Sequence, residues 1–169
     1  RGAGDEPLYL RRPVTLVESR QPKRYDLQVR FPPTVAALPA EERSGDTLWT
    51  ALASDLRQRI GEARSTLVFT NSRRLSEKLT RLVNDGGPRE IAWSHHGSLS
   101  RELRGAIEQR LKAGDLPALV ATSSLELGID IGALDQVLLV QAPRSLASAA
   151  QRVGRAGHGV GEVSRARLY

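Results

Sequence analysis

Short apolar runs and longer stretches of mixed polarity alternate along this chain. The apolar runs cover Thr66–Thr70, Ala118–Thr122 and Gln136–Val140, which predicts strands that are covered on both faces of a sheet. Between them, leucine and isoleucine recur every three or four residues, which is typical of helices with one buried face. This alternation of strand and helix predicts an α/β fold in which helices cover both faces of a mainly parallel sheet.

Residues with capping side chains precede the predicted helices. Asp46, Asn71-Ser72 and Ser100 are expected to cap three of them. Gly61 and Gly114 are expected to end the first and the third. The buried faces expected for these helices consist of Leu48, Leu52, Leu56 and Ile60, then Leu75, Leu79 and Leu82, then Leu103, Ile107 and Leu111.

The remaining segments are shorter or less regular. We predict strands at Val14–Glu18, Tyr25–Phe31, Ile91–Trp93 and Val163–Tyr169, a helix near Ser145–Val153, and a loop at Ala36–Gly45. In the second strand, Leu27, Val29 and Phe31 alternate with polar residues, which predicts one buried face. We expect residues 1–12 to be a polar lead-in and residues 13–169 to form one domain.

Composition limits the classes of function. The chain has 169 residues, of which 40% are hydrophobic, and this is enough for one ordinary core. Its formal net charge of +6 favours polyanionic partners such as nucleic acid. The absence of cysteine excludes disulfides, zinc–thiolate sites and cysteine nucleophiles.

The ends of the chain and its hydropathy suggest its context. No apolar run is long enough to span a membrane, so we expect a cytoplasmic location, close to the nucleoid in a bacterium. The chain starts at Arg1 and contains no methionine. We therefore expect it to be part of a longer protein.

Four polar motifs follow predicted strand ends, where ligands gather in parallel α/β sheets. The first, Val68–Arg74, leads from a strand into a capped helix with two arginines. From the residues alone, an ordinary helix cap with solvated arginines is the alternative. The second motif, His95–Arg104, begins with a histidine pair. Adjacent histidines without carboxylate or cysteine partners are poor metal ligands, so we expect no metal site there.

The other two motifs are longer. Val120–Ile131 starts as an apolar strand and continues through the hydroxyl residues Thr122–Ser124 into Leu-Glu-Leu-Gly-Ile-Asp-Ile. Gln151–His158 reads Gln-Arg-Val-Gly-Arg-Ala-Gly-His, in which two glycines flank Arg155. Glycines allow a sharply bent backbone, and a guanidinium can fork onto phosphate oxygens. The last motif therefore predicts contact with a phosphate group.

Together, Val120–Ile131 and Gln151–His158 resemble motifs V and VI of superfamily 2 helicases, and their wording resembles the large helicase-related (Lhr) family. Val68–Arg74 is similar to motif IV, and His95–Arg104 resembles the motif between IV and V. This resemblance implies the second RecA-like lobe of a helicase, with residues 1–12 as an interlobe linker. The chain has no Gly-x-x-x-x-Gly-Lys-Ser/Thr loop and no acidic pair for Mg²⁺, which belong to the first lobe.

The resemblance implies a motor function. The parent protein would be an ATP-dependent helicase that moves along single-stranded DNA in the 3′-to-5′ direction and acts in DNA repair. ATP would lie between the two lobes with its Mg²⁺ held by the first lobe, and the isolated chain would be inactive. The implied partners are the first lobe and single-stranded DNA, a DNA:RNA hybrid or RNA, with no membrane. Two alternatives stay open, namely a superfamily 2 RNA helicase or remodeller and a non-catalytic nucleic-acid-binding module of the same fold.

The resemblance also assigns candidate site residues. Arg155 has the position of an arginine finger, and Gln151 that of a polar residue sensing the γ-phosphate, so both are catalytic candidates. Many superfamily members carry an arginine where this chain has His158, which leaves the role of His158 open. The candidates for nucleotide contact are Gly128, Asp130, Arg152 and His158. The candidates for nucleic-acid contact are Ser72, Arg73, His96, Gly97, Thr122 and Ser123.

Overall fold

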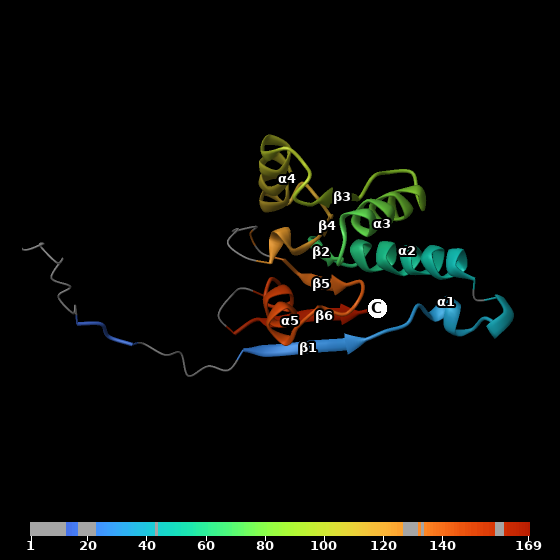
Figure 1. Cartoon of the computed structure of the whole chain (residues 1–169), viewed down its shortest axis with the longest axis horizontal. Coiled ribbons are helices and arrows are strands. Elements are labelled where there is room, and N and C mark those ends of the chain that lie inside the picture. Colours follow the sequence, from blue (N-terminus) through green and yellow to red (C-terminus); the bar gives the residue numbers. More distant parts are fainter. Residues whose placement is uncertain (1–12, 17–22, 43, 127–131, 133, 158–160) are drawn as a thin grey trace, which may run out of the picture.

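A six-stranded parallel sheet is the centre of the described chain, in the strand order β1-β6-β5-β2-β4-β3 (Figure 1). The computed structural model describes residues 13–16, 23–42, 44–126, 132, 134–157 and 161–169. The predicted parallel α/β sheet is confirmed. The strands are Arg24–Val29 (β1), Thr66–Phe69 (β2), Ala92–His95 (β3), Ala118–Ala121 (β4), Gln136–Leu139 (β5) and Val163–Leu168 (β6).

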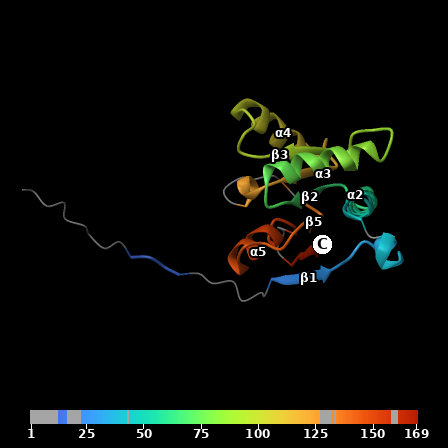
Figure 2. The same cartoon turned by 45° about the vertical axis from the view of Figure 1, so that its right-hand side comes forward.

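Helices cover both faces of this sheet, as the strand pattern predicts. On one face, α2 and α3 pack against Val68 and Leu138, whereas α4 and α5 pack against Leu67 and Val137 on the other. Figure 2 shows α2 and α5 on opposite sides of β5. The described helices are Pro33–Ala36 (α1), Gly45–Gly61 (α2), Arg73–Asp85 (α3), Arg101–Ala113 (α4) and Leu146–Val153 (α5), with 3₁₀ turns at Ala40–Glu42 and Ser123–Leu125. None of these helices has the length and hydropathy of a membrane-spanning segment.

Side-chain caps set the helix starts. The Ser72 and Ser100 hydroxyls accept hydrogen bonds from main-chain N–H groups three residues on, each at 3.2 Å, which confirms both predicted caps. Ser145 caps α5 in the same way, at 3.1 Å. Each cap satisfies an N–H group that has no partner within its helix. Gly114 ends α4 with φ = 81°, in the left-handed region that glycine adopts at little cost.

The start of α2 differs from the prediction. Ser44, not Asp46, is its cap, and the Ser44 hydroxyl accepts from the N–H of Thr47 at 3.2 Å. Asp46 lies in the first turn instead, where its negative carboxylate interacts favourably with the positive end of the helix dipole. The observed cap lies two residues nearer the N-terminus than the predicted one. Serine and aspartate are nearly equivalent caps, so the local sequence does not distinguish between them.

The predicted burial of β1 is wrong. Leu27, Val29 and Phe31 are 61%, 81% and 54% exposed. The strand lies at the edge of the sheet, pairs with β6 alone among the described strands, and is not covered by a described helix. The alternation of the sequence therefore marks a strand correctly but does not show whether anything packs on its apolar face.

Smaller departures from the predictions concern single side chains and two short segments. Leu103 is 48% exposed rather than buried, and Val83 takes the fully buried place on α3 that we expected for Leu82. Val14–Leu16, the described part of the first predicted strand, forms no strand. The expected loop before α2 contains a 3₁₀ turn at Ala40–Glu42.

Candidate nucleic-acid and nucleotide interface

The carboxyl ends of β2, β4 and β3 lie side by side, and polar candidates follow each of them. The pairing places Phe69 opposite Ala121, and Ala121 opposite His95. Beyond this register, the N–H of Thr70 donates to the Ala121 carbonyl at 2.8 Å, and that of Thr122 donates to the His95 carbonyl at 3.2 Å. We call this side of the sheet the carboxyl edge. It brings together the nucleic-acid candidates Ser72, Arg73, His96, Gly97, Thr122 and Ser123.

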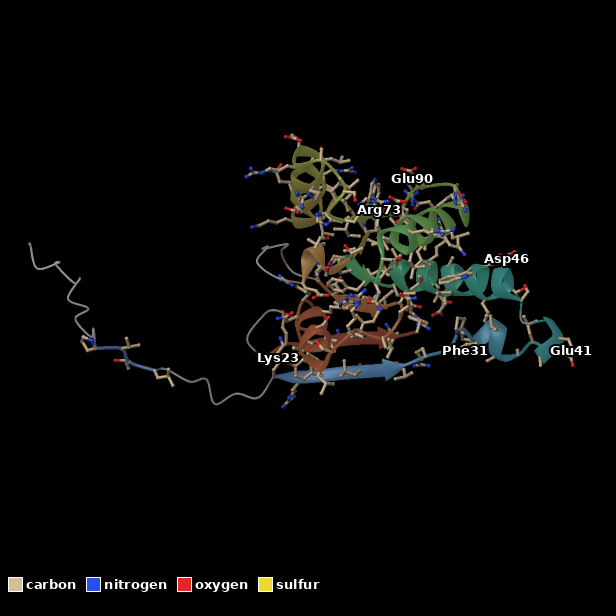
Figure 3. The ribbon with its side chains drawn as sticks, in the orientation of Figure 1. Lys23, Phe31, Glu41, Asp46, Arg73 and Glu90 are labelled. Atoms are coloured by element: carbon tan, nitrogen blue, oxygen red, sulfur yellow. The ribbon has the colours of Figure 1, made fainter. Side chains whose placement is uncertain are left out.

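Arg73 reaches across this edge. It lies in the first turn of α3 (Figure 3). Its Nη1 donates to the Ser98 hydroxyl at 2.8 Å. Both side chains are exposed, as are Ser72, Gly97 and Ser123. The hydroxyl of Ser72 already accepts the capping bond, so its structural role is established whether or not it also meets a ligand. The exposed face of the edge thus presents the Arg73 guanidinium among hydroxyl groups and a glycine.

The histidine pair is buried. His95 has no exposed surface, and its Nε2 lies 2.8 Å from Oε1 of Glu108 while its Nδ1 lies 2.9 Å from the hydroxyl of Ser124. Burial lowers the pKa of His95 below its ordinary value, against the opposing effect of the Glu108 carboxylate. A neutral ring can donate to Glu108 and accept from Ser124. His95 therefore connects the turn after β4, through Ser124, to α4, through Glu108.

His96 is buried as well, with 4% of its surface exposed. Its Nε2 lies 3.1 Å from Oε1 of Glu77 on α3, and its Nδ1 has no hydrogen-bond partner among the described residues. The ring is thus turned into the domain, and Gly97 is the exposed member of the pair that follows β3. Among the described residues, no cluster of three or more histidine, aspartate or glutamate side chains could hold a metal ion.

A buried ion pair connects three of the motifs. Nε and Nη2 of Arg152 each lie 2.7 Å from Oε1 of the Glu126 carboxylate. Only 4% of the Arg152 side chain is exposed, and its Nη1 also donates to Oδ1 of Asn71 at 3.1 Å. Ser148 donates to the same Glu126 oxygen at 3.1 Å. The guanidinium that we predicted to contact nucleotide therefore has partners from motifs IV and V within the chain.

Sequence reasoning missed Glu126 and Asn71 as members of this network. A usable signal was weak: Arg152 precedes the apolar Val153 in a short helix, and an arginine that is buried there requires an acidic partner. The sequence alone does not say which carboxylate supplies it.

Arg155 also contacts Glu126. Its side chain is half-buried, and Nη2 donates to the main-chain oxygen of Glu126 at 2.5 Å. Gln151, four residues earlier on α5, is exposed. Gly157 has φ = 62°, and a Cβ atom there would lie 2.6 Å from the carbonyl oxygen of Val163. Glycine is thus required by both conformation and space. The remaining candidates, Gly128, Asp130 and His158, lie outside the described residues.

A polar cavity of about 230 Å³ opens where these motifs meet. Thr70 lines the cavity together with residues of the Glu126–Arg152–Asn71 network. The other lining residues are Asn71, Ser123, Glu126, Arg144, Ser148 and Arg152. All of these side chains are polar or charged, so the cavity suits a charged ligand rather than an apolar one.

Known proteins resemble this chain in sequence. Residues 49–159 match the family described as "Helicase conserved C-terminal domain". The chain is 39% identical to the Lhr helicase/probable uracil glycosylase of Mycolicibacterium smegmatis, over 93% of this chain and 12% of that protein. It is 37% identical to the Lhr helicase/uracil glycosylase of Escherichia coli, over 100% of this chain and 14% of that protein. The chain thus spans roughly an eighth of the length of these relatives.

Solved structures agree. The helicase Lhr of Mycobacterium smegmatis, bound to single-stranded DNA and AMP-PNP, superposes with a TM-score of 0.79 and 46% identity, covering 92% of this chain and 21% of that one. The DUF1998 helicase MrfA, bound to DNA and AMPPNP, matches with a TM-score of 0.64 and 27% identity, covering 85% and 20%. The chain belongs to the helicase conserved C-terminal domain family, as a C-terminal superfamily 2 lobe of the Lhr type.

Proposed function

We propose that this chain is the second motor lobe of an ATP-dependent helicase that moves along single-stranded DNA. One observation carries the proposal, namely that Glu126 is bonded to both arginines of motif VI, Arg152 and Arg155. Motif V starts at the carboxyl edge, where the nucleic-acid candidates lie, and its Glu126 contacts both arginines. Such a connection suits a motor lobe in which binding and hydrolysis of ATP must be coupled to movement along the nucleic-acid strand.

Arg155 is the arginine finger in this proposal. Phosphoryl transfer is catalysed mainly by positioning and charge stabilisation, and an arginine supplied from a second lobe adds both. The half-buried Arg155 is held at Glu126 by its Nη2, and the exposed Gln151 can face the same ligand. ATP would lie between the lobes with Mg²⁺ held by the first lobe. Gly128, Asp130 and His158 stay nucleotide candidates by family resemblance, whereas the burial of Arg152 favours a positioning role.

The strand path follows the carboxyl edge. Thr122, Ser123 and Ser72 would offer hydroxyl groups to phosphates, Arg73 a guanidinium, and Gly97 a close approach of the backbone. The buried His96 would shape the adjacent turn rather than touch the strand. The relatives' names and the DNA bound in solved structures support DNA as the substrate. Movement from 3′ to 5′ and a role in repair are proposed from the Lhr resemblance.

The test uses the full-length parent. Arg155→Ala should leave ATP affinity nearly unchanged and slow single-turnover hydrolysis by about three orders of magnitude, the range for a lost arginine finger. His158→Ala should slow it less, because a neutral imidazole offers one donor where a guanidinium offers a fork. Arg64→Ala is the matched control, since this arginine is exposed and lies before β2, at the opposite end of the strands. Hydrolysis by Arg155→Ala at the rate of the control would refute the assignment.

A further inference from the structure

Arg144 is a charged residue that neither the motifs nor the proposed function uses. It is exposed in the connection between β5 and α5 and lines the polar cavity. The other two charged residues of the lining, Glu126 and Arg152, neutralise each other at 2.7 Å. In the described part of the chain, the guanidinium of Arg144 makes no hydrogen bond or ion pair. The cavity therefore carries one uncompensated positive charge, which favours an anionic ligand.

The backbone that carries Arg144 is fixed from several sides. Gln141, near the start of the connection, has φ = 79°, a left-handed conformation that residues with a side chain rarely adopt. Its N–H donates to the Tyr169 carbonyl at 3.2 Å. Next to it, the carbonyl of Ala142 accepts from Nδ2 of Asn71 at 2.9 Å. Strained backbone of this kind is retained where surrounding contacts require it, and it gathers at functional sites.

The residues on either side of Arg144 restrict it further. Pro143 has a fixed φ angle, and Ser145 is the cap of α5. Arg144 thus stands directly before the positive end of a helix, whose first N–H groups add to the attraction for an anion. The Asn71 side chain that holds this connection also holds Arg152, so the position of Arg144 is tied to motifs IV and VI.

We propose that Arg144 binds a phosphate group in the polar cavity, and that the phosphate belongs to the nucleic-acid strand that crosses the carboxyl edge. This inference rests on the proposed function. The cavity is shared with Asn71 and Ser123, which follow β2 and β4 at that edge. Arg155 lies beyond the other end of α5, which is eight residues or about 12 Å long. In this proposal the phosphate at Arg144 is separate from the γ-phosphate assigned to Arg155.

The experiment compares Arg144→Ala and Arg144→Lys in the full-length protein, with Arg64→Ala as control. Binding of single-stranded oligonucleotides of several sequences is measured from low to high salt, and binding of a non-hydrolysable ATP analogue is measured alongside. Arg144→Ala should weaken strand binding about tenfold on every sequence, the loss expected for one charge-assisted contact. The salt slope should fall by about 0.7, because one phosphate contact is lost. Arg144→Lys should recover part of both losses, and nucleotide affinity should stay at the control value.

The other outcomes have defined meanings. Weaker nucleotide binding with unchanged strand binding would assign the phosphate to ATP and overturn the nucleic-acid assignment. No change in either affinity would overturn the phosphate site itself. Arg73→Ala separates the inference from the function on which it rests. If Arg73→Ala weakens strand binding and Arg144→Ala does not, the role of Arg144 fails and the strand path stands; if neither does, the path proposed along the carboxyl edge also fails.

Discussion

Replacing Glu126 by alanine should destabilise the domain by about 3–5 kcal/mol, the usual cost of leaving one buried charge without its partner. The side chain left behind, Arg152, is 4% exposed and loses both of its 2.7 Å contacts with Glu126. Two favourable contacts survive, the 3.1 Å bond from Nη1 to Asn71 and the stacking of the guanidinium 5.2 Å from the centre of the Phe69 ring. They place the expected loss towards the lower end of that range.

Urea denaturation measures this loss. With a denaturant dependence of about 2 kcal/mol per molar urea, a loss of 3 kcal/mol moves the unfolding midpoint down by about 1.5 M. Arg64→Ala is the matched control, because its 3.7 Å pair with Asp135 involves an arginine side chain that is 93% exposed. An exposed pair of this kind contributes about 0–1 kcal/mol. The control midpoint should therefore move by less than about 0.5 M.

A double-mutant cycle makes the prediction sharper. Arg152→Met removes the buried charge and keeps an apolar side chain, so combining it with Glu126→Ala should cost clearly less than the sum of the two single changes. A midpoint for Glu126→Ala within 0.5 M (roughly 1 kcal/mol) of the native protein would refute the reasoning. So would strict additivity in the cycle, because independent effects would mean that the two side chains are not coupled in the folded state.

Two further predictions concern His95 and Gly157. Burial holds the pKa of His95 below 6.5, so the unfolded chain binds a proton that the folded domain does not; its contribution to stability should be complete above pH 6.5 and lost as the pH falls below it. Urea midpoints measured across this range should fall less steeply for His95→Gln than for the native protein, and parallel curves would contradict this. Gly157→Ala should lower the thermal midpoint by about 2–8 °C, because a side chain in the left-handed region costs about 1–2 kcal/mol, and the contact of its Cβ with the Val163 carbonyl should add to this loss. Gly105→Ala in α4 is the control, where no atom lies within 4 Å of the added carbon, and it should not be destabilising.

The sequence predicted what depends on neighbours along the chain. Ser72 and Ser100 act as caps because the N–H group that each one satisfies is three residues away. The central strands were found because a run of apolar residues is itself sufficient evidence for burial on both faces. The order of the motifs then placed their polar residues at one edge, because parallel strands end on the same side of a sheet.

Contacts between distant segments could not be predicted in this way. The partner of Arg152 is 26 residues away, and Asn71 is 81 residues away from the same guanidinium. The sequence does not show that His95 is buried, whereas the structure encloses it between α4 and the turn after β4. Nothing local separates the exposed Leu103 from the buried Ile107, since both fit the same helical spacing. Which residues meet is decided by how the layers stack.

The exposed face of β1 affects how this domain behaves in solution. Tyr25, Leu27 and Val29 present apolar side chains on a strand whose other side is unpaired among the described strands. Natural proteins usually blunt such an edge with lysine, proline or a bulge, because a bare edge invites a strand of another molecule to extend the sheet. Concentrated solutions of the excised domain are therefore prone to self-association through β1. Replacing Leu27 or Val29 by lysine should reduce this self-association and leave both hydrophobic cores unchanged, because neither residue belongs to them.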